Sequence, residues 1–228
     1  MKTIGILGGF SPQATLDFEA RIHQVSQRLI PQQVNGGYPP MIAYYHRRPP
    51  VLTKDGFMPV LPLQPDPALL EAARYLGTKA DFLVVTANGP HVFQDQFVQA
   101  AGRQVLSMIS LTLEEVKRRG WKRVGLLGFP DPSVIVYAQP LSEMGLACEV
   151  IDARLQAQLN ADVLALMEGR TTGTAAQDAV GALRQKTVDG IILGCTEIPL
   201  LLGAQAEQLN LINPLALLAE AAVKFALD

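Results

Sequence analysis

The chain has 228 residues, of which 49% are hydrophobic and 18% charged, with a net charge of -2. It is long enough to bury one large or two small cores, and its composition is typical of a compact folded protein. The near-neutral charge gives no electrostatic reason to expect nucleic acid or an anionic membrane as a partner. No uninterrupted apolar stretch approaches the roughly 20 residues that a membrane helix needs. The sequence starts with a strand and a glycine turn rather than a signal peptide, and two cysteines cannot form a disulfide framework, so we expect a cytoplasmic protein.

Short apolar runs alternate with longer stretches of helical periodicity along the whole chain. This pattern predicts an α/β fold with parallel strands and helices on both faces of the sheet. The expected strands are 3–7, 41–45, 82–85, 104–107, 123–127, 147–151, 190–193 and 210–212. The expected helices are 14–29, 67–76, 94–101, 111–119, 133–144, 155–168, 175–186 and 214–226.

The two halves of the chain repeat one another. Residues 2–8 and 122–128 both read as a strand that ends at glycine, and residues 81–88 align with 189–196. The second alignment places Ala87 opposite Cys195 and Asn88 opposite Thr196. We therefore predict two pseudo-symmetric parallel-sheet α/β domains with the active site in the cleft between them, where small-ligand pockets concentrate. The first domain is expected to comprise residues 1–98 plus 209–228, and the second residues 99–208.

The strongest chemical signal is the segment 194–199, Gly-Cys-Thr-Glu-Ile-Pro, directly after the apolar run 188–193. A thiol at the carboxyl end of a buried strand lies where open α/β sheets bind their ligands. The alternative is an inert cysteine, since unpaired cysteines are commonly buried. Cys148 lies inside a strand-like run and is expected to be structural. The three histidines do not have metal-ligand spacing, so we expect no metal site.

A second candidate is the glycine turn after the first expected strand. Its glycines do not match the dinucleotide or phosphate-loop fingerprints. Ser11 is expected to cap a helix that has Pro12 at its first position. The N–H groups of this turn could hold a carboxylate, or the turn could be purely structural.

Three segments together resemble the aspartate/glutamate racemase superfamily: residues 4–12, residues 194–199 and the closing stretch 212–222. Members of this superfamily are cofactor-independent amino-acid racemases with two catalytic cysteines. The resemblance implies a small carboxylic or amino acid as substrate, no cofactor and a homodimer. It also implies that one thiolate removes the α-proton while a thiol on the opposite face returns one, a role that suits a group whose pKa nearby donors can lower.

The resemblance fails at the first thiol. The superfamily's motif Cys-Asn-Thr-x-His reads Ala-Asn-Gly-Pro-His at residues 87–91. In the second half, Phe129, Pro130 and Asp131 stand where the family has a Thr-Gly-Thr-like loop. The catalytic candidates are Cys195, Ala87 as the position of the missing thiol, and Thr86 as a replacement proton source. The candidate substrate-binding residues are Gly9, Ser11, Arg48, Asn88, Gly89, Thr196 and Glu197.

Three functions stay open on these residues. The first is an amino-acid racemase-type isomerase, of the aspartate/glutamate kind, that uses Cys195 as acid and base and is impaired or altered by the missing thiol. The second is a single-cysteine decarboxylase of the arylmalonate decarboxylase type, because decarboxylation generates a carbanion without a base. The third is a non-catalytic protein that binds a small acid.

Overall fold

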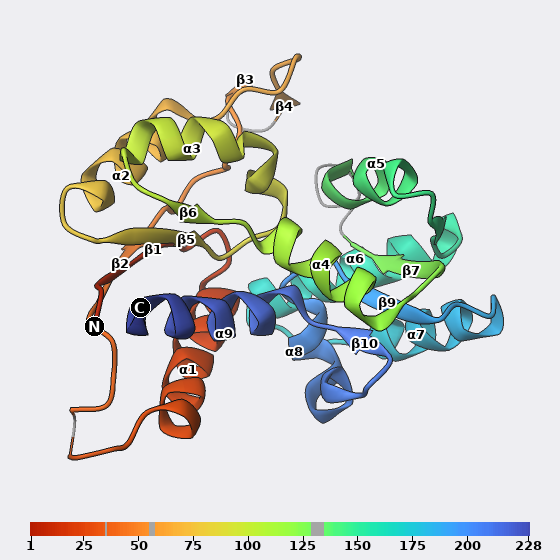
Figure 1. Cartoon of the computed structure of the whole chain (residues 1–228). Coiled ribbons are helices and arrows are strands. Elements are labelled where there is room, and N and C mark those ends of the chain that lie inside the picture. Colours follow the sequence, from red (N-terminus) through yellow and green to blue (C-terminus); the bar gives the residue numbers. More distant parts are fainter. Residues whose placement is uncertain (35, 55–57, 129–134) are drawn as a thin grey trace. The chain divides into compact units, whose positions relative to one another are not determined.

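The computed structural model describes residues 1–34, 36–54, 58–128 and 135–228. The chain divides into two compact units, which are Met1–Met108 with Leu215–Asp228, and Ile109–Pro214. Each unit contains a four-stranded sheet in which every strand pairing is parallel (Figure 1). The predicted α/β class with two parallel sheets is confirmed. Among the described residues, no helix is both long and apolar enough to cross a membrane.

The sheet of the first unit has the strand order β2-β1-β5-β6. Helices α2 and α3 cover one of its faces, and α1 and α9 cover the other (Figure 1). The strands are β1 (Ile4–Gly8), β2 (Met41–Tyr45), β5 (Phe82–Val85) and β6 (Val105–Leu106). The helices are α1 (Pro12–Leu29), α2 (Pro67–Gly77), α3 (Gln94–Ala101) and α9 (Pro214–Leu227).

The central strands are apolar at consecutive positions because helices bury both faces of the sheet. Leu83 and Val85 of β5 belong to one core cluster with Leu69 of α2. The intervening Phe82 points to the other face, where its ring packs 4.7 Å from that of Phe225 in α9. The alternation of side chains along a strand therefore divides β5 between two helical layers.

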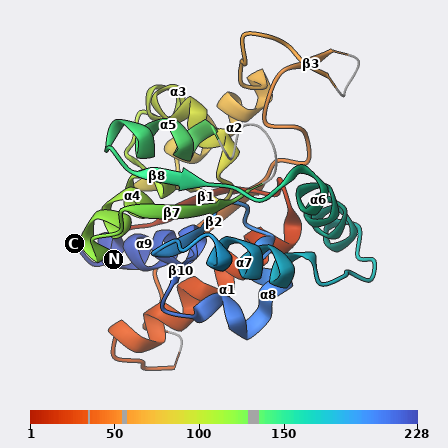
Figure 2. The ribbon, with the colours of Figure 1, turned by 90° about the vertical axis from the view of Figure 1, so that its right-hand side faces the viewer.

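The sheet of the second unit has the order β10-β9-β7-β8. Its strands are β7 (Arg123–Leu127), β8 (Ala147–Glu149), β9 (Gly190–Leu193) and β10 (Leu211–Ile212). The described helices are α4 (Met108–Arg119), α5 (Ile135–Glu143), α6 (Ala153–Met167), α7 (Ala175–Gln185) and α8 (Ile198–Leu202). Helices α6, α7 and α8 share a core cluster with β7 and β9, while α4 and α5 lie on the opposite face (Figure 2).

The internal repeat is visible in the strand pairing. In the first unit Leu7 of β1 pairs with Val85 of β5, and the N–H of Thr86 donates to the carbonyl of Leu7 at 3.1 Å. In the second unit Leu127 of β7 pairs with Leu193 of β9 in the same way, and the N–H of Gly194 donates to the carbonyl of Leu127 at 2.5 Å. Ala87 and Cys195 are the residues that follow these two, so they occupy equivalent positions in their own units.

The structure differs from the sequence-based prediction in the boundaries of the two units and in two additional short strands. The sequence placed the first boundary after residue 98, whereas the pairing of β6 with β5 keeps the chain in the first unit as far as Met108. It placed the return to the first unit at residue 209, whereas the structure has it at Leu215. Two short strands, β3 (Thr53–Lys54) and β4 (Met58–Pro59), lie on an arm that projects from the first unit (Figure 2).

Candidate active site

Cys195, Thr196 and Glu197 form a hydrogen-bonded group in the turn between β9 and α8. The thiol of Cys195 donates to Oε2 of Glu197 over 2.9 Å, and the hydroxyl of Thr196 donates to the same oxygen over 3.1 Å. The N–H of Ile198 closes the turn by donating to the Cys195 carbonyl at 3.1 Å. All three side chains are 5–7% exposed. A thiol, a hydroxyl and a carboxylate at the carboxyl end of a buried strand are thus in direct contact.

The local sequence explains why the thiol stands there. Cys195 is part of the apolar cluster that contains Ile191 and Leu193, because alternate residues of β9 face the same helical layer. Gly194 is closely packed at the strand end, since a Cβ there would lie 3.0 Å from both the Leu127 carbonyl oxygen and a methyl carbon of Leu126. The turn is therefore fixed by close packing on both sides of the cysteine.

Two amide side chains that the sequence analysis did not select lie at the carboxyl end of β7. Nε2 of Gln156 donates to the Gly128 carbonyl at 2.9 Å and to Oδ1 of Asn160 at 2.8 Å. Gln156 and Asn160 are one turn apart on α6, and this spacing was the only feature of the sequence that could have indicated that the two side chains interact. The next residues, Phe129, Pro130 and Asp131, lie outside the described residues.

In the first unit, the segment after β5 is held in place by a buried histidine. Nδ1 of His91 lies 2.8 Å from the Ala87 carbonyl oxygen, and Nε2 accepts the N–H of Met108 at 3.2 Å. Because Nε2 is the acceptor, Nδ1 carries the proton and the ring is neutral. Burial lowers the pKa of His91 to about 4, against the opposing effect of the bond to Ala87. His91 thus fixes the backbone at Ala87 and stays uncharged at neutral pH.

The positions equivalent to the Cys-Thr-Glu segment are different in character. Ala87 is partly exposed, Asn88 is buried, and Gly89 begins the short 3-10 helix Gly89–Phe93. Asn88 precedes this helix, and its carbonyl accepts the N–H of His91 at 3.1 Å. A methyl group, an amide and a glycine therefore stand where the second unit has a thiol, a hydroxyl and a carboxylate.

Thr86 takes part in a buried hydroxyl network on the α1 side of the sheet. Its Oγ1 lies 3.0 Å from Oγ1 of Thr15, which also accepts the Gly9 N–H at 2.9 Å and donates to the Ser11 carbonyl at 3.2 Å. Either hydroxyl can be the donor across the contact between Thr15 and Thr86. The network bonds the Gly9 N–H to Thr15 inside the fold and pairs the Thr86 hydroxyl with that of Thr15. Thr15, one helical turn after Ser11, was missed because threonine in a helix is ordinarily unremarkable.

The glycine turn itself is shaped by the neighbouring strand. Gly9 has φ +83°, and a Cβ there would lie 2.6 Å from the Cα of Tyr45. The expected cap at Ser11 is confirmed, because its hydroxyl accepts the Ala14 N–H at 3.5 Å and Pro12 opens α1. Ser11 is 5% exposed. These contacts account for the glycines and the serine as structural elements of the β1–α1 turn.

Arg48 follows β2 on the surface of the first unit. Its Nη1 lies 4.0 Å from Oδ2 of Asp66, and its side chain is 66% exposed. Nε2 of the buried His46 lies 4.0 Å from the same oxygen, and burial lowers the pKa of His46. Oδ1 of Asp66 caps α2 by accepting the Ala68 N–H at 2.8 Å. Arg48 is thus a solvent-exposed cation loosely paired with a carboxylate that the sequence analysis did not identify.

Cys148 behaves differently from Cys195. It is an unpaired cysteine in β8 with intermediate exposure. Burial, followed by the neighbouring charge of Glu149, raises the pKa of its thiol. These surroundings fit the structural role expected for it.

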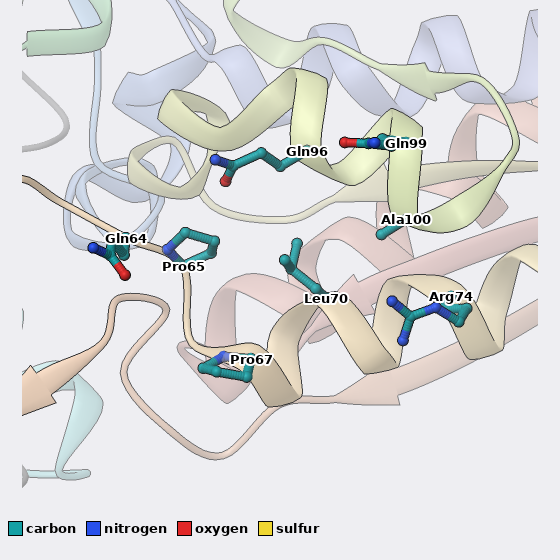
Figure 3. A pocket seen from close by; sticks show the side chains of 8 residues that line it. All are labelled: Gln64, Pro65, Pro67, Leu70, Arg74, Gln96, Gln99 and Ala100. Atoms are coloured by element: carbon teal, nitrogen blue, oxygen red, sulfur yellow. The ribbon is translucent and has the colours of Figure 1, made fainter.

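A groove of about 550 Å³ lies on the surface of the first unit, between α2 and α3 (Figure 3). Leu70 and Ala100 line it together with the side chains of Arg74, Gln96 and Gln99, and the segment 64–67 closes one end. None of the catalytic or substrate-binding candidates lines this groove.

One family model matches nearly the whole chain, and solved structures share its fold. The sequence model described as Asp/Glu/Hydantoin racemase matches residues 7–222. The chain is 26% identical over 226 residues to the broad specificity amino-acid racemase RacX of Bacillus subtilis, with 96% of each chain covered. It also resembles the structure of an aspartate racemase homologue from Pyrococcus horikoshii, with a TM-score of 0.76, 23% identity and complete coverage of both chains. The aspartate racemase of Picrophilus torridus gives a TM-score of 0.77 at 22% identity, with 99% of this chain and 94% of that one covered.

The chain belongs to the Asp/Glu/hydantoin racemase family. The resemblance seen in the glycine turn, the Gly-Cys-Thr-Glu segment and the closing stretch is therefore confirmed at the level of family and fold.

Proposed function

We propose that the protein is a cofactor-independent amino-acid isomerase in which Cys195 transfers a proton at the α-carbon of its substrate. The observation that carries the proposal is the contact of the Cys195 thiol with a buried carboxylate at the carboxyl end of β9, in a chain of the racemase family. The α-proton of an amino acid is only weakly acidic, so the carbanion needs a water-poor site and polar groups around the carboxylate. As the family resemblance implies, the protein would act without pyridoxal phosphate and as a homodimer. The two cysteines and the spacing of the histidines favour a cytoplasmic protein without a metal.

The candidate groups of this proposal lie at the carboxyl ends of β1 and β5 in the first unit and of β9 in the second unit. Asn88 is the polar side chain proposed to bind the substrate carboxylate, together with Gly89 and Ser11 of the same unit. Thr196 would contribute only its backbone N–H, because its hydroxyl donates to Glu197. The contacts of Gly9 argue that its N–H is not a carboxylate ligand, because Thr15 already accepts it. Arg48, which is exposed and only loosely paired with Asp66, is proposed to pair with an anionic group of the substrate.

The methyl side chain of Ala87 limits the chemistry that the site can perform. An alanine at the position equivalent to Cys195 supplies no proton-transfer group, and loss of a general acid or base typically lowers the rate by about 10²–10⁴-fold. The Thr86 hydroxyl is buried in a hydrogen bond with Thr15, and His91 is neutral and bonded at both ring nitrogens. A water molecule is therefore a better candidate than Thr86 for proton transfer on that face, and inversion is expected to be slow.

The test is α-proton exchange in D₂O followed by NMR, with L- and D-aspartate, L- and D-glutamate and a set of substituted malonates. The proposal expects exchange at the α-carbon that disappears in Cys195→Ser. It also expects Ala87→Cys to raise the rate of inversion, because the second face then carries a thiol. Cys148→Ser is the matched control and should leave both rates unchanged.

The other outcomes separate the alternatives. Loss of CO₂ from a malonate in a Cys195-dependent reaction would replace the racemase with a single-cysteine decarboxylase. Binding of these acids with neither exchange nor decarboxylation would replace it with a binding protein. Exchange that persists in Cys195→Ser would refute the assignment of the thiol.

A further inference from the structure

We propose that Glu197 holds the Cys195 thiol in its protonated form, so that the sulfur begins each reaction as a proton donor. Glu197 then acts on the thiol as a positioning residue rather than as a ligand of the substrate. The inference deepens the proposed function and rests on it, because it concerns the direction of proton transfer at the same sulfur.

The geometry joins two donors to one acceptor. An ionised carboxylate can only accept hydrogen bonds, so the protons of the Cys195 thiol and the Thr196 hydroxyl both point at Oε2 of Glu197. The sulfur–oxygen separation of 2.9 Å is a close contact for a thiol donor. With only 5–7% of each side chain exposed, water competes little for these bonds.

The balance between the two acids decides where the shared proton rests. A carboxylic acid is a much stronger acid than a thiol, so of the two groups the carboxylate is the one that gives up its proton. Moving the proton to the carboxylate only exchanges one buried anion for another, so burial does not overturn this preference. A thiolate beside an ionised Glu197 would add the repulsion of two like charges. The resting pair is therefore a thiol and a carboxylate.

The charged residues on the helices packed against this turn have hydrogen-bond partners of their own or are exposed, so they do not offset the charge of Glu197. Asp162 of α6 accepts the N–H groups of Gly173 and Ala175, and Arg184 of α7 donates to Gln208 and Asn210. On the same two helices, Asp178 accepts from Thr174, and Arg154 is exposed. Helix α8 carries no charged residue.

The proton step follows directly. Water on the face of Ala87 first takes the α-proton, and the C–H bonding pair stays on the α-carbon as a carbanion. The lone pair of that carbanion takes the proton from Cys195, a new C–H bond forms, and the S–H bonding pair stays on sulfur as a thiolate. The adjacent carboxylate disfavours that thiolate, so it recovers a proton from water and the pair is reset. Cys195 is thus arranged to donate a proton to the substrate carbanion, and removal of a proton from the substrate by Cys195 is the less favourable direction.

The test measures the thiol in the ligand-free protein, in a Cys148→Ser background that leaves one cysteine. The rate of alkylation by iodoacetamide is followed against pH, because only the thiolate reacts. We expect the midpoint to lie above that of an unperturbed cysteine, and Glu197→Gln to lower it by about one pH unit or more, since a neighbouring like charge is removed. Glu168→Gln, the same change at an exposed carboxylate paired with Arg170, should leave the midpoint in place.

A midpoint at or below neutral pH in the parent protein would overturn the proposal, as would a Glu197→Gln midpoint that does not move or that rises. The infrared S–H stretching band gives a second measurement that needs neither a reagent nor a folded Glu197→Gln variant. The band assigned by its loss in Cys195→Ser should lie at lower frequency than the band of an unbonded thiol. Its absence from the parent protein, or an unbonded frequency, would also overturn the proposal. Neither measurement needs substrate, so its result is separate from that of the exchange experiment.

Discussion

The buried imidazole of His91 predicts a specific loss of stability in mild acid. Its pKa is about 4 in the folded protein and 6.5 in the unfolded chain, so the unfolded state binds the proton more tightly. A group with a depressed pKa in the folded state contributes no penalty above pH 6.5, and the folded state loses stability as the pH falls from 6.5 towards 4. The complete loss is about 3 kcal/mol, and about 2 kcal/mol of it is reached by about pH 5.

The assay is urea unfolding at about pH 7.5 and about pH 5, for the parent protein and for His91→Gln. An amide can donate to the Ala87 carbonyl and accept the Met108 N–H without titrating. The variant should therefore lose about 2 kcal/mol less than the parent between the two pH values. The range stops above the carboxylate region because Glu115, whose pKa is lowered to about 2 by its bonds to Arg118 and Arg119, contributes only as the pH falls below 4.5.

Because His46 also has a lowered pKa, both proteins should retain some pH dependence, and only their difference reports on His91. Equal pH dependence in parent and variant would refute the assignment of a neutral, doubly bonded His91. A variant that is more pH-sensitive than the parent would refute it as well.

Two further predictions concern stability at neutral pH. Gly190→Ala should destabilise the second unit by about 1–3 kcal/mol or more in thermal unfolding, because a Cβ there would lie 2.1 Å from the ring of Trp121. The control is Gly181→Ala on α7, where a Cβ meets nothing within 4 Å, and this change should be neutral or stabilising in the same assay. Thr15→Val should cost about 1–3 kcal/mol in urea unfolding, since it leaves the buried Gly9 N–H without its acceptor. Thr15→Ser keeps the hydroxyl and should cost clearly less, and equal losses in the two variants would contradict this role for the Oγ1 atom.

Local pattern was enough to predict most of the elements. The strands and helices of both units follow from apolar runs and helical periodicity, and the Ser11 cap follows from a serine before a proline. The equivalence of Ala87 and Cys195 could also be read from the repeated sequence, because each residue follows a strand of the same pattern. The two strands of the surface arm were not predicted, since β3 and β4 have only two residues each.

The first unit's boundary shows what sequence alone does not decide. The sequence predicted a strand at 104–107, but only the pairing of β6 with β5 across the intervening helix assigns that strand to the first unit. Similarly, Thr86 pairs with Thr15 across 71 positions, and His91 bonds to Met108 across 17. Periodicity reports which residues share a face of one element and carries no information about partners on another.

The sequence by itself determined the family, the α/β class and the chemical types present at the strand ends, because these depend on residue identity and local spacing. The tertiary structure decided how those groups are used. It joined the Cys195 thiol and the Thr196 hydroxyl to a single oxygen of Glu197, and it committed the Thr86 hydroxyl to Thr15. Hydrogen bonds require atoms to meet within about 3 Å in a particular direction. Only the packed arrangement of helices and strands fixes which side chains satisfy that condition.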